Sequence, residues 1–140
     1  MFVQFEVEGE PRGKGRPRFA NVKGKVITRT PDETVLYENQ IKFAYKDVAE
    51  DVFFGQGKAL EISIYAFYTI PKSASKKKQA EMLAGRIRPT KKPDWDNVGK
   101  VVCDALNGVA YHDDTQIVSA RVIKKYAERP RLAITIAEVS

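Results

Sequence analysis

The sequence predicts an α+β fold in which a mixed β-sheet of about four to five strands carries helices on one face. Residues 59–70 alternate apolar and polar side chains with the period of a strand, whereas residues 37–52 and 98–109 repeat apolar side chains at helical spacing. We place residues 59–70 in the centre of the sheet. With 43% hydrophobic content, 140 residues are enough for one core but not for two. We therefore expect a single domain over residues 1–140.

The N-terminal part is expected to contain two strands and a helix. Residues 2–10 have the pattern of a strand, and residues 25–30 that of a short second strand. Thr30, Pro31 and Glu33 then combine an N-cap, a first-turn proline and a capping-box glutamate, which predicts the start of a helix. The apolar stripe of this helix comprises Tyr37, Ile41, Ala44, Tyr45, Val48 and Val52.

A basic insert and a C-terminal hairpin are expected after the central strand. Residues 71–93 form the insert, which contains at most one short helix at 75–84 and lacks a strong apolar stripe. Because little in it would attach to the core, we expect the insert to be mobile. Residues 116–127 and 131–139 have the pattern of two strands, joined as a hairpin around residues 128–130.

An amphipathic helix is expected between the insert and the last strands, with Pro93 and Asp94 at its N-terminus. Its apolar face comprises Val98, Val101, Val102, Ala105 and Val109, in the i, i+3, i+4, i+7, i+11 pattern. The opposite face carries Asp96, Lys100, Asp104 and Asn107, with Asn97 at its margin. The helix therefore begins with two carboxylates and presents a lysine one turn later.

The net charge of +6 is unevenly distributed along the chain. Residues 11–18, 72–78 and 86–92 each contain four Lys or Arg and no acid, and together they hold half of the 24 basic residues. Gly, Pro or Ser in all three clusters predicts loops, where flexible contacts with phosphates can form. Any one cluster has an ordinary explanation as solvated loop charge. The three together favour a polyanionic partner.

Four carboxylates lie around the amphipathic helix, those of Asp94, Asp96, Asp113 and Asp114. Each has an ordinary explanation, because Asp is common at helix N-caps, in first turns and in tight turns, and Lys100 is placed to pair with Asp96. These explanations do not account for four carboxylates beside clustered cations. A bound divalent cation such as Mg²⁺ would account for this arrangement, because it binds carboxylate oxygens and completes its coordination shell with water and phosphate oxygens.

One ion can bind carboxylates from both ends of this helix only if the chain follows a particular path. Asp94, Asp96 and one of Asp113 and Asp114 converge if the chain after Gly108 turns back toward the helix N-terminus, as a strand returning alongside the helix would do. The ion would then lower the pKa of a bound water and stabilise the charge that develops on a phosphodiester. Lys100 would be a further cation at that site.

Other chemistries have less support. His112 is the one histidine and Cys103 the one cysteine, so a His-based zinc site or a Ser-His-Asp triad would depend on a single residue. We expect Cys103 to be at least half-buried and His112 to be a turn residue or a neighbour of the site. GKG at residues 13–15 lacks the spacing of a P-loop. Because neither a secretory signal nor a run of eighteen apolar residues is present, we expect a cytoplasmic protein with no membrane partner.

Along the amphipathic helix and the acidic turn after it, the sequence resembles the RusA-type Holliday junction resolvases. These are crossover junction endodeoxyribonucleases of bacteria and their prophages that act in DNA recombination and repair. The family pattern of PD-x-DN, a lysine, DALNG and DD-x-Q is found here at residues 93–97, Lys100, 104–108 and 113–116. GKGRPRF, the RTP before the first helix and the insert also resemble phage-type members, so the likeness covers nearly the whole chain. Trp95 and Gly99 depart from the aliphatic residues expected there.

The resemblance implies a RusA-like fold and a Mg²⁺-dependent homodimer that nicks four-way junction DNA symmetrically, with Mn²⁺ as the alternative ion. It implies metal ligands at Asp94, Asp96 and Asp114, with Asp113 as a further candidate, and a catalytic role for Lys100 beside the first three. The DNA contacts expected from the three basic clusters are Arg12, Lys14, Arg16, Arg18, Lys72, Lys76, Lys77, Lys78, Arg86, Arg88, Lys91 and Lys92.

Two other functions stay open at this point. A nucleotidyltransferase-like enzyme would also use an Asp-x-Asp pair and a distant carboxylate to hold two metal ions. The lack of a triphosphate-cradling loop beside Asp94 argues against that enzyme. The other alternative is a non-catalytic nucleic-acid-binding module, in which the acidic residues only cap helices.

Overall fold

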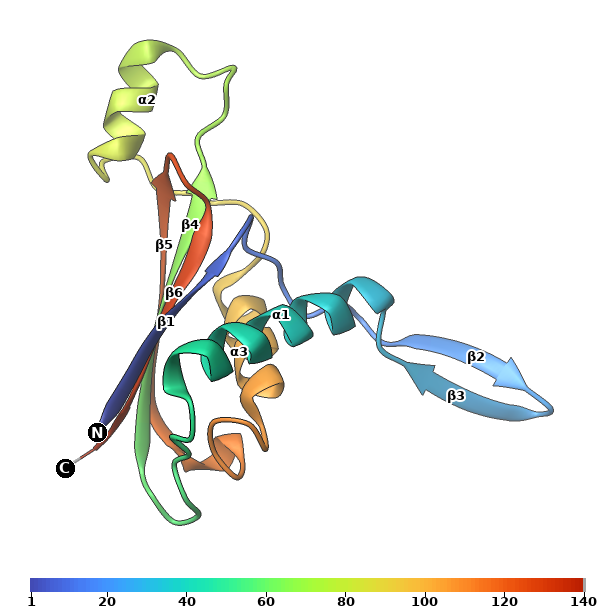
Figure 1. Cartoon of the computed structure of the whole chain (residues 1–140). Helices are drawn as coiled ribbons and strands as arrows, with labels where there is room; N and C mark the ends of the chain where they lie inside the picture. The colour runs from blue at the N-terminus through green and yellow to red at the C-terminus, as the bar shows by residue number, and fades with distance from the viewer. Residues whose placement is uncertain (140) are drawn as a thin grey trace.

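A four-stranded mixed sheet in the order β1-β6-β4-β5 forms the centre of the computed structural model, which describes residues 1–139 (Figure 1). The side chain of Arg18, a predicted DNA contact, lies outside the described part. In chain order the elements are β1 (Phe2–Glu8), β2 (Arg18–Val22), β3 (Lys25–Arg29), α1 (Asp32–Ala49), β4 (Leu60–Thr69), α2 (Lys76–Leu83), α3 (Trp95–Leu106), the 3₁₀ helix η1 (Asp114–Gln116), β5 (Ile117–Ala127) and β6 (Arg131–Glu138).

Strand β4 is central, as predicted. It pairs antiparallel with β6 and parallel with β5. Its alternation follows the sequence, because every second side chain is buried: those of Leu60, Ile62, Ile64, Ala66 and Tyr68. Helices α1 and α3 both lie on one side of the sheet (Figure 1). The predicted α+β class, with one mixed sheet and helices on one face, is confirmed.

The prediction of a C-terminal hairpin is wrong. Strands β5 and β6 form, but β4 lies between them, and β6 pairs with β4 and β1 instead. The alternation of side chains along a strand predicts which face is buried, but it does not predict which strands are neighbours.

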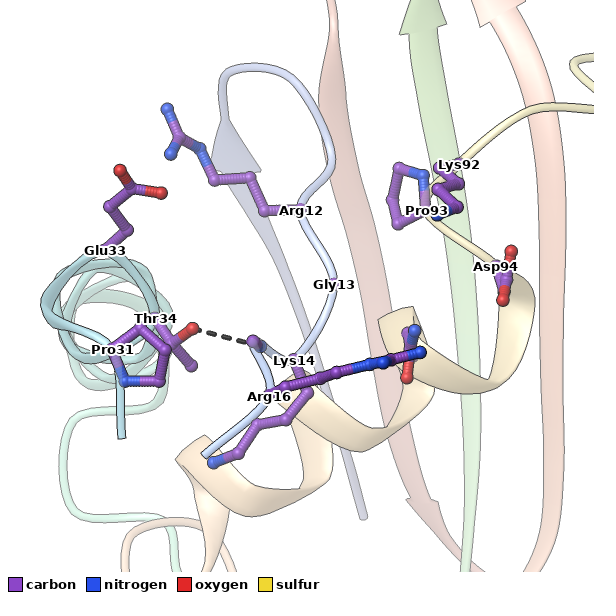
Figure 2. Close-up of a pocket in the computed structure, with 12 residues that line it drawn as sticks. Arg12, Gly13, Lys14, Arg16, Pro31, Glu33, Thr34, Lys92, Pro93 and Asp94 are labelled. Carbon is purple, nitrogen blue, oxygen red and sulfur yellow. Dashed lines mark hydrogen bonds between the residues drawn. The ribbon is translucent and has the colours of Figure 1, made fainter. Parts of the chain in front are cut away.

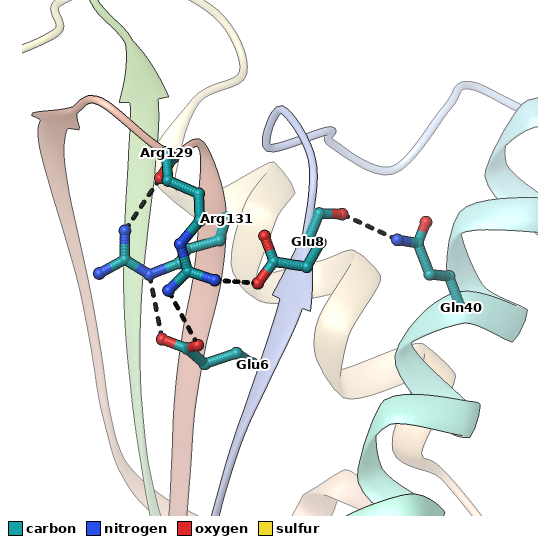
Figure 3. Close-up of polar contacts among 5 residues, drawn as sticks. All are labelled: Glu6, Glu8, Gln40, Arg129 and Arg131. Carbon is teal, nitrogen blue, oxygen red and sulfur yellow. Dashed lines mark hydrogen bonds and ion pairs between the residues drawn. The ribbon is translucent and has the colours of Figure 1, made fainter.

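Ion pairs hold the connection between β5 and β6 beside β1 (Figure 3). Arg129 contacts both Glu8 and Glu6, the latter at 3.2 Å between Nη2 and Oε1, and Arg131 Nε lies 3.0 Å from Glu6 Oε2. The hydrogen bond from Arg131, with further help from Arg129, keeps the pKa of Glu6 below its ordinary value. Gln40 of α1 donates to the backbone oxygen of Glu8 at 2.8 Å. This end of β1 is therefore attached to both the connection and the helix layer.

Strands β2 and β3 form a separate hairpin that extends away from the main sheet (Figure 1). The short strand predicted at residues 25–30 is confirmed as β3, but β2 was not predicted. Every side chain of β3 is exposed, and Phe19 of β2 is 73% exposed. Because none of the described side chains of the hairpin is buried, β2 lacks the alternation that reveals a strand in a sequence.

Helix α1 begins one residue later than predicted and differs in its cap. Pro31 occupies the N-cap without a side-chain hydrogen bond, so the predicted Thr30 cap is wrong. The buried face follows a row at four-residue spacing, Tyr37, Ile41, Tyr45 and Ala49, and Val48 is 53% exposed. Such a row rotates around the helix, because four residues exceed one turn of 3.6. The predicted stripe is therefore wrong at Val48, and the helix ends at Ala49, before the predicted stripe residue Val52.

Helices α2 and α3 occur where the sequence predicts them. The hydroxyl of Ser75 accepts a hydrogen bond from the Lys78 amide and caps α2, while the mobility of the insert stays a prediction. Helix α3 buries Val98, Val101, Val102, Ala105 and Leu106, whereas Val109 lies beyond its end and is partly buried. None of the described helices is both long and apolar enough to cross a membrane.

Candidate active site

Two carboxylates at the start of α3 lie on the surface. Asp94 occupies the N-cap, but its side chain makes no capping hydrogen bond, and both Asp94 and Asp96 are exposed. The two residues share a hollow of about 430 Å³. The other residues that line this acidic hollow are Thr90, Lys91, Lys92, Trp95 and Lys124. The structure thus places two carboxylates next to three lysines.

A buried tyrosine fixes the backbone directly before Asp94. The Tyr68 hydroxyl, on β4, donates to the backbone oxygen of Pro93 at 2.8 Å. Burial, with smaller contributions from Tyr37, Asp94 and Glu10, raises the pKa of Tyr68 to about 12. The hydroxyl therefore remains protonated near neutral pH and continues to donate. This bond connects the start of α3 to the central strand of the sheet.

Lys124 is a site residue that sequence reasoning missed. Strand β5 runs alongside α3, close enough that a Cβ added at Gly99 would lie 3.5 Å from Val122 Cγ2. Two residues further on, Lys124 Nζ donates to the backbone oxygen of Lys91 at 2.5 Å. Burial lowers the pKa of Lys124, Asp94 raises it and Lys91 lowers it further. A lysine on a strand gives no signal in the sequence that would have identified it as a site residue.

The N-terminal basic cluster approaches Asp94 from the other side, across a second hollow of about 640 Å³ (Figure 2). In this view the loop of Arg12 and Arg16 runs between α1 and the segment of Pro93 and Asp94. The Lys14 amide donates to the backbone oxygen of Asn97 at 3.2 Å, which fixes the loop to α3. Cations from the first and third basic clusters therefore line one hollow with Asp94.

Close packing explains two glycines of this loop. A Cβ at Gly13 would lie 2.9 Å from Asn97 Cβ, and a Cβ at Gly15 would lie 2.4 Å from Thr34 Oγ1. The Gly15 amide donates to that same Thr34 oxygen at 3.0 Å, the dashed line in Figure 2. Side chains at these positions would force the loop away from the two helices.

Lys14 connects α1 to α3 through ion pairs. Its Nζ lies 3.1 Å from Glu38 Oε2 and 3.2 Å from Asp104 Oδ2, and the Lys14 side chain is 19% exposed. Burial alone would lower the pKa of Lys14, but the hydrogen bonds to the two carboxylates outweigh it and raise the pKa. The predicted DNA contact of Lys14 stays a prediction, alongside this structural role.

Asp113 and Asp114 lie at the opposite end of α3. Asp113 caps η1 by accepting from the Thr115 amide at 3.0 Å, and hydrogen bonding to Thr115 holds the pKa of Asp113 below its ordinary value. Asp114 Oδ2 accepts from Asn107 Nδ2 at 3.4 Å. Asn107 is the C-cap of α3, whose 12 residues span about 18 Å at 1.5 Å per residue. Asp114 is therefore about a helix length from Asp96 of the same chain.

The expected return of the chain does occur, but it brings a different residue to Asp94. Strand β5 begins after Asp114 and reaches the start of α3 only at Lys124. Within residues 1–139, no group of three or more Asp, Glu, His or Cys side chains is arranged to hold a metal ion. One chain thus brings Asp94 and Asp96 together, and it leaves Asp113 and Asp114 apart from them.

The remaining predicted residues lie as follows. Lys100 is exposed one turn beyond Asp96, His112 is exposed, and Cys103 is half-buried as predicted. Burial raises the pKa of the Cys103 thiol to about 11, so it stays protonated near neutral pH. Arg88 donates to the Lys124 backbone oxygen at 3.3 Å and attaches the insert to β5. The exposed cations of the insert are Lys72, Lys76, Lys77, Lys78, Arg86, Arg88, Lys91 and Lys92.

Two comparisons with known proteins each find a match over most of the chain. The family model described as Endodeoxyribonuclease RusA matches residues 8–137 of the chain. The chain is also 37% identical, over 140 residues, to a Bacillus subtilis (strain 168) protein with the name "Uncharacterized protein YqaN". That match covers 99% of this chain and 97% of the relative. The matched region includes the insert, all of α3 and η1.

Replacing Lys14 should destabilise the fold. We expect Lys14→Met to lower the free energy of unfolding by about 1–3 kcal/mol, because Glu38 and Asp104 would be deprived of a half-buried charged hydrogen-bond partner. Urea denaturation measures the change. Arg16→Met, at an exposed position of the same loop, is the control and should change the free energy by less than about 0.5 kcal/mol. Equal stability of the two variants would contradict the structural role of Lys14.

Proposed function

Because the chain belongs to the RusA family of endodeoxyribonucleases, we propose that it is a Mg²⁺-dependent homodimer that resolves four-way DNA junctions by symmetric paired nicks. One observation carries the proposal. Asp94, whose side chain makes no capping hydrogen bond, and the exposed Asp96 share a hollow with three lysines. Carboxylates in this arrangement suit a cation, and the lysines suit the phosphates of its substrate.

The Asp94 and Asp96 pair fits a magnesium ion. Mg²⁺ in nucleic-acid enzymes is typically held by one or two carboxylates, with water and phosphate oxygens completing the octahedron. Asp94 is available for this purpose because no capping hydrogen bond occupies its side chain. The bound ion would supply a water of lowered pKa and stabilise charge on the phosphodiester. Mn²⁺ accepts the same oxygen ligands and is the alternative.

The cations around this pair would hold the DNA backbone. Lys91, Lys92 and Lys124 line the acidic hollow, and Arg12 and Arg16 line the neighbouring one. Phosphate contacts of this kind fix the orientation of a duplex without reading its sequence. Lys100 projects from the same face of α3 one turn beyond Asp96, where it would approach a phosphate near the cut.

The third carboxylate would come from a second copy of the chain. Asp113 is occupied in capping η1, so Asp114 is the better candidate ligand. Asp114 contacts the C-cap of α3, about 18 Å of helix away from the end that carries Asp94 and Asp96, which is too far to share one ion. If two α3 helices ran antiparallel across a two-fold axis, Asp114 of each copy would face Asp94 and Asp96 of the other. Such a dimer would carry two sites, one for each of the two cuts.

The alternatives have less support. In a binding module whose acids only cap helices, Asp94 would be expected to make a capping hydrogen bond, and it makes none. A nucleotidyltransferase would share the acidic pair, but the family match favours cleavage of DNA.

A labelled four-way junction tests this function. With Mg²⁺ we expect two nicks, placed symmetrically in strands of like polarity, and no cut in a linear duplex of the same sequence. Chelation of the metal should stop cleavage while the protein still shifts the junction on a native gel. Failure to cut any branched DNA with either Mg²⁺ or Mn²⁺ would refute the proposal.

Neutralising either carboxylate of the pair should abolish cleavage without preventing binding. We expect Asp94→Asn and Asp96→Asn to lower the cleavage rate at least about 100-fold, the scale on which removal of one electrostatic group slows catalysis. Junction affinity should stay within about threefold, because the cations that hold phosphates are unchanged. Asp47→Asn, at an exposed position of α1, is the control. Normal turnover in either site variant would remove that residue from the catalytic set.

The cations of α2 should contribute to phosphate binding. We expect the triple change of Lys76, Lys77 and Lys78 to alanine to weaken junction binding and to reduce its log–log salt slope, by up to about 0.9 for each phosphate that the variant no longer neutralises. Fluorescence anisotropy of labelled DNA over a series of salt concentrations measures the slope. Lys42→Ala with Lys46→Ala on α1, which removes two cations instead of three, is the control and should reduce the slope less. An unchanged slope in the triple variant would show that α2 does not contact DNA.

A further inference from the structure

Trp95 is an exposed aromatic residue between the two candidate metal ligands. It is the one tryptophan of the chain, begins α3, and is 65% exposed. The core-facing residues of α3 start only at Val98, so Trp95 is not part of the contact between α3 and the sheet. A large aromatic side chain in such a position gains from contact with another flat apolar surface.

The surroundings of Trp95 favour a nucleotide as the other surface. It lines the acidic hollow together with Lys91, Lys92 and Lys124. Those cations suit phosphates, while the indole ring suits the face of a base, and stacking of bases on aromatic side chains tolerates any sequence. Other aromatic residues are exposed, including Phe43 of α1, which is 74% exposed. Phe43, however, does not line this hollow.

We infer that Trp95 stacks on a base that lacks a stacking neighbour at the branch point of the DNA, and so helps the protein to select branched over linear DNA. This inference rests on the proposed function, because it places the DNA strand at Asp94 and Asp96. In a linear duplex both faces of each base are covered by neighbouring bases. Where strands exchange partners at a junction, a base face can be offered to a side chain.

Because Trp95 lies between Asp94 and Asp96 in the sequence, a base stacked on it would lie close to the phosphate that is cut. Its neighbours Asp94 and Asp96 would hold the ion beside the phosphate to be cut, and a base lies close to its own phosphate. A base stacked on the indole ring would therefore align the strand over the carboxylates. Trp95 would be a substrate-selecting residue in contact with DNA, and Asp94 and Asp96 would remain the ligands.

The single tryptophan gives a direct readout of this contact. We would excite Trp95 at the red edge of its absorption, without divalent cations, and titrate the protein with a four-way junction or a linear duplex of the same composition. The fraction bound is measured separately from the anisotropy of labelled DNA. At equal saturation the junction should quench the emission strongly and the duplex only weakly.

Substitution gives a second readout. Trp95→Ala should weaken junction binding about 10-fold, within the range for removal of one base–aromatic stack, and leave duplex binding within about twofold. Trp95→Phe should retain most of the junction affinity. Phe43→Ala is the matched control and should change neither affinity. If Trp95→Ala fails to fold, Trp95→Phe and the quenching of the wild-type protein still decide.

Several outcomes overturn the inference. A saturated junction that leaves the emission unchanged would show that no base meets Trp95, and equal quenching by duplex would remove its role in selection. Emission that is already shifted to the blue, and that changes on dilution without DNA, would show that a second copy covers the ring. Quenching by a junction that the protein never cuts with Mg²⁺ would support the stacking contact while refuting the proposed nuclease function.

Discussion

Helix α3 buries Val98, Val101, Val102 and Ala105 against the rest of the core, and this contact fixes the positions of the acidic groups. Each fully buried valine contributes about 1.5–3 kcal/mol to the free energy of folding, so this face attaches the helix firmly to the core. Its length then separates Asp94 and Asp96 at one end from Asp113 and Asp114 at the other. The proposed site follows from that separation, since two of the carboxylates share a hollow and the others cannot reach it in the same chain.

The start of α3 collects residues from distant parts of the sequence. Tyr68 of β4 holds the Pro93 carbonyl, the Lys14 amide holds the Asn97 carbonyl, and β5 delivers Lys124. Each of these contacts is a packing contact or a hydrogen bond to the backbone, and none of them is needed for catalysis itself. The same interactions that stabilise the fold therefore place cations on both sides of Asp94. The result is an acidic pair surrounded by cations. This arrangement suits a metal ion that coordinates a phosphate of the bound DNA.

Long periodic segments made much of this fold predictable from sequence. The alternation in β4 and the apolar face of α3 were confirmed, since each reflects one buried side. Strand β2 was missed because none of its described side chains is buried, and the predicted hairpin was wrong because alternation does not specify neighbours. In the site, the spacing identified the Asp94 and Asp96 pair, but Lys124 and the separation of Asp114 depend on the path of the chain in space.

Mixing two inactive variants tests most directly whether each site takes Asp114 from a second copy. Asp96→Asn and Asp114→Asn chains, each carrying a different tag, would be co-expressed and the mixed dimer purified on both tags. A shared site predicts one intact Asp94, Asp96 and Asp114 set in the mixed dimer, and therefore one Mg²⁺-dependent nick per junction, although each parent dimer is inactive. A mixed dimer as inactive as its parents, or an Asp114→Asn dimer that cuts normally, would contradict the account.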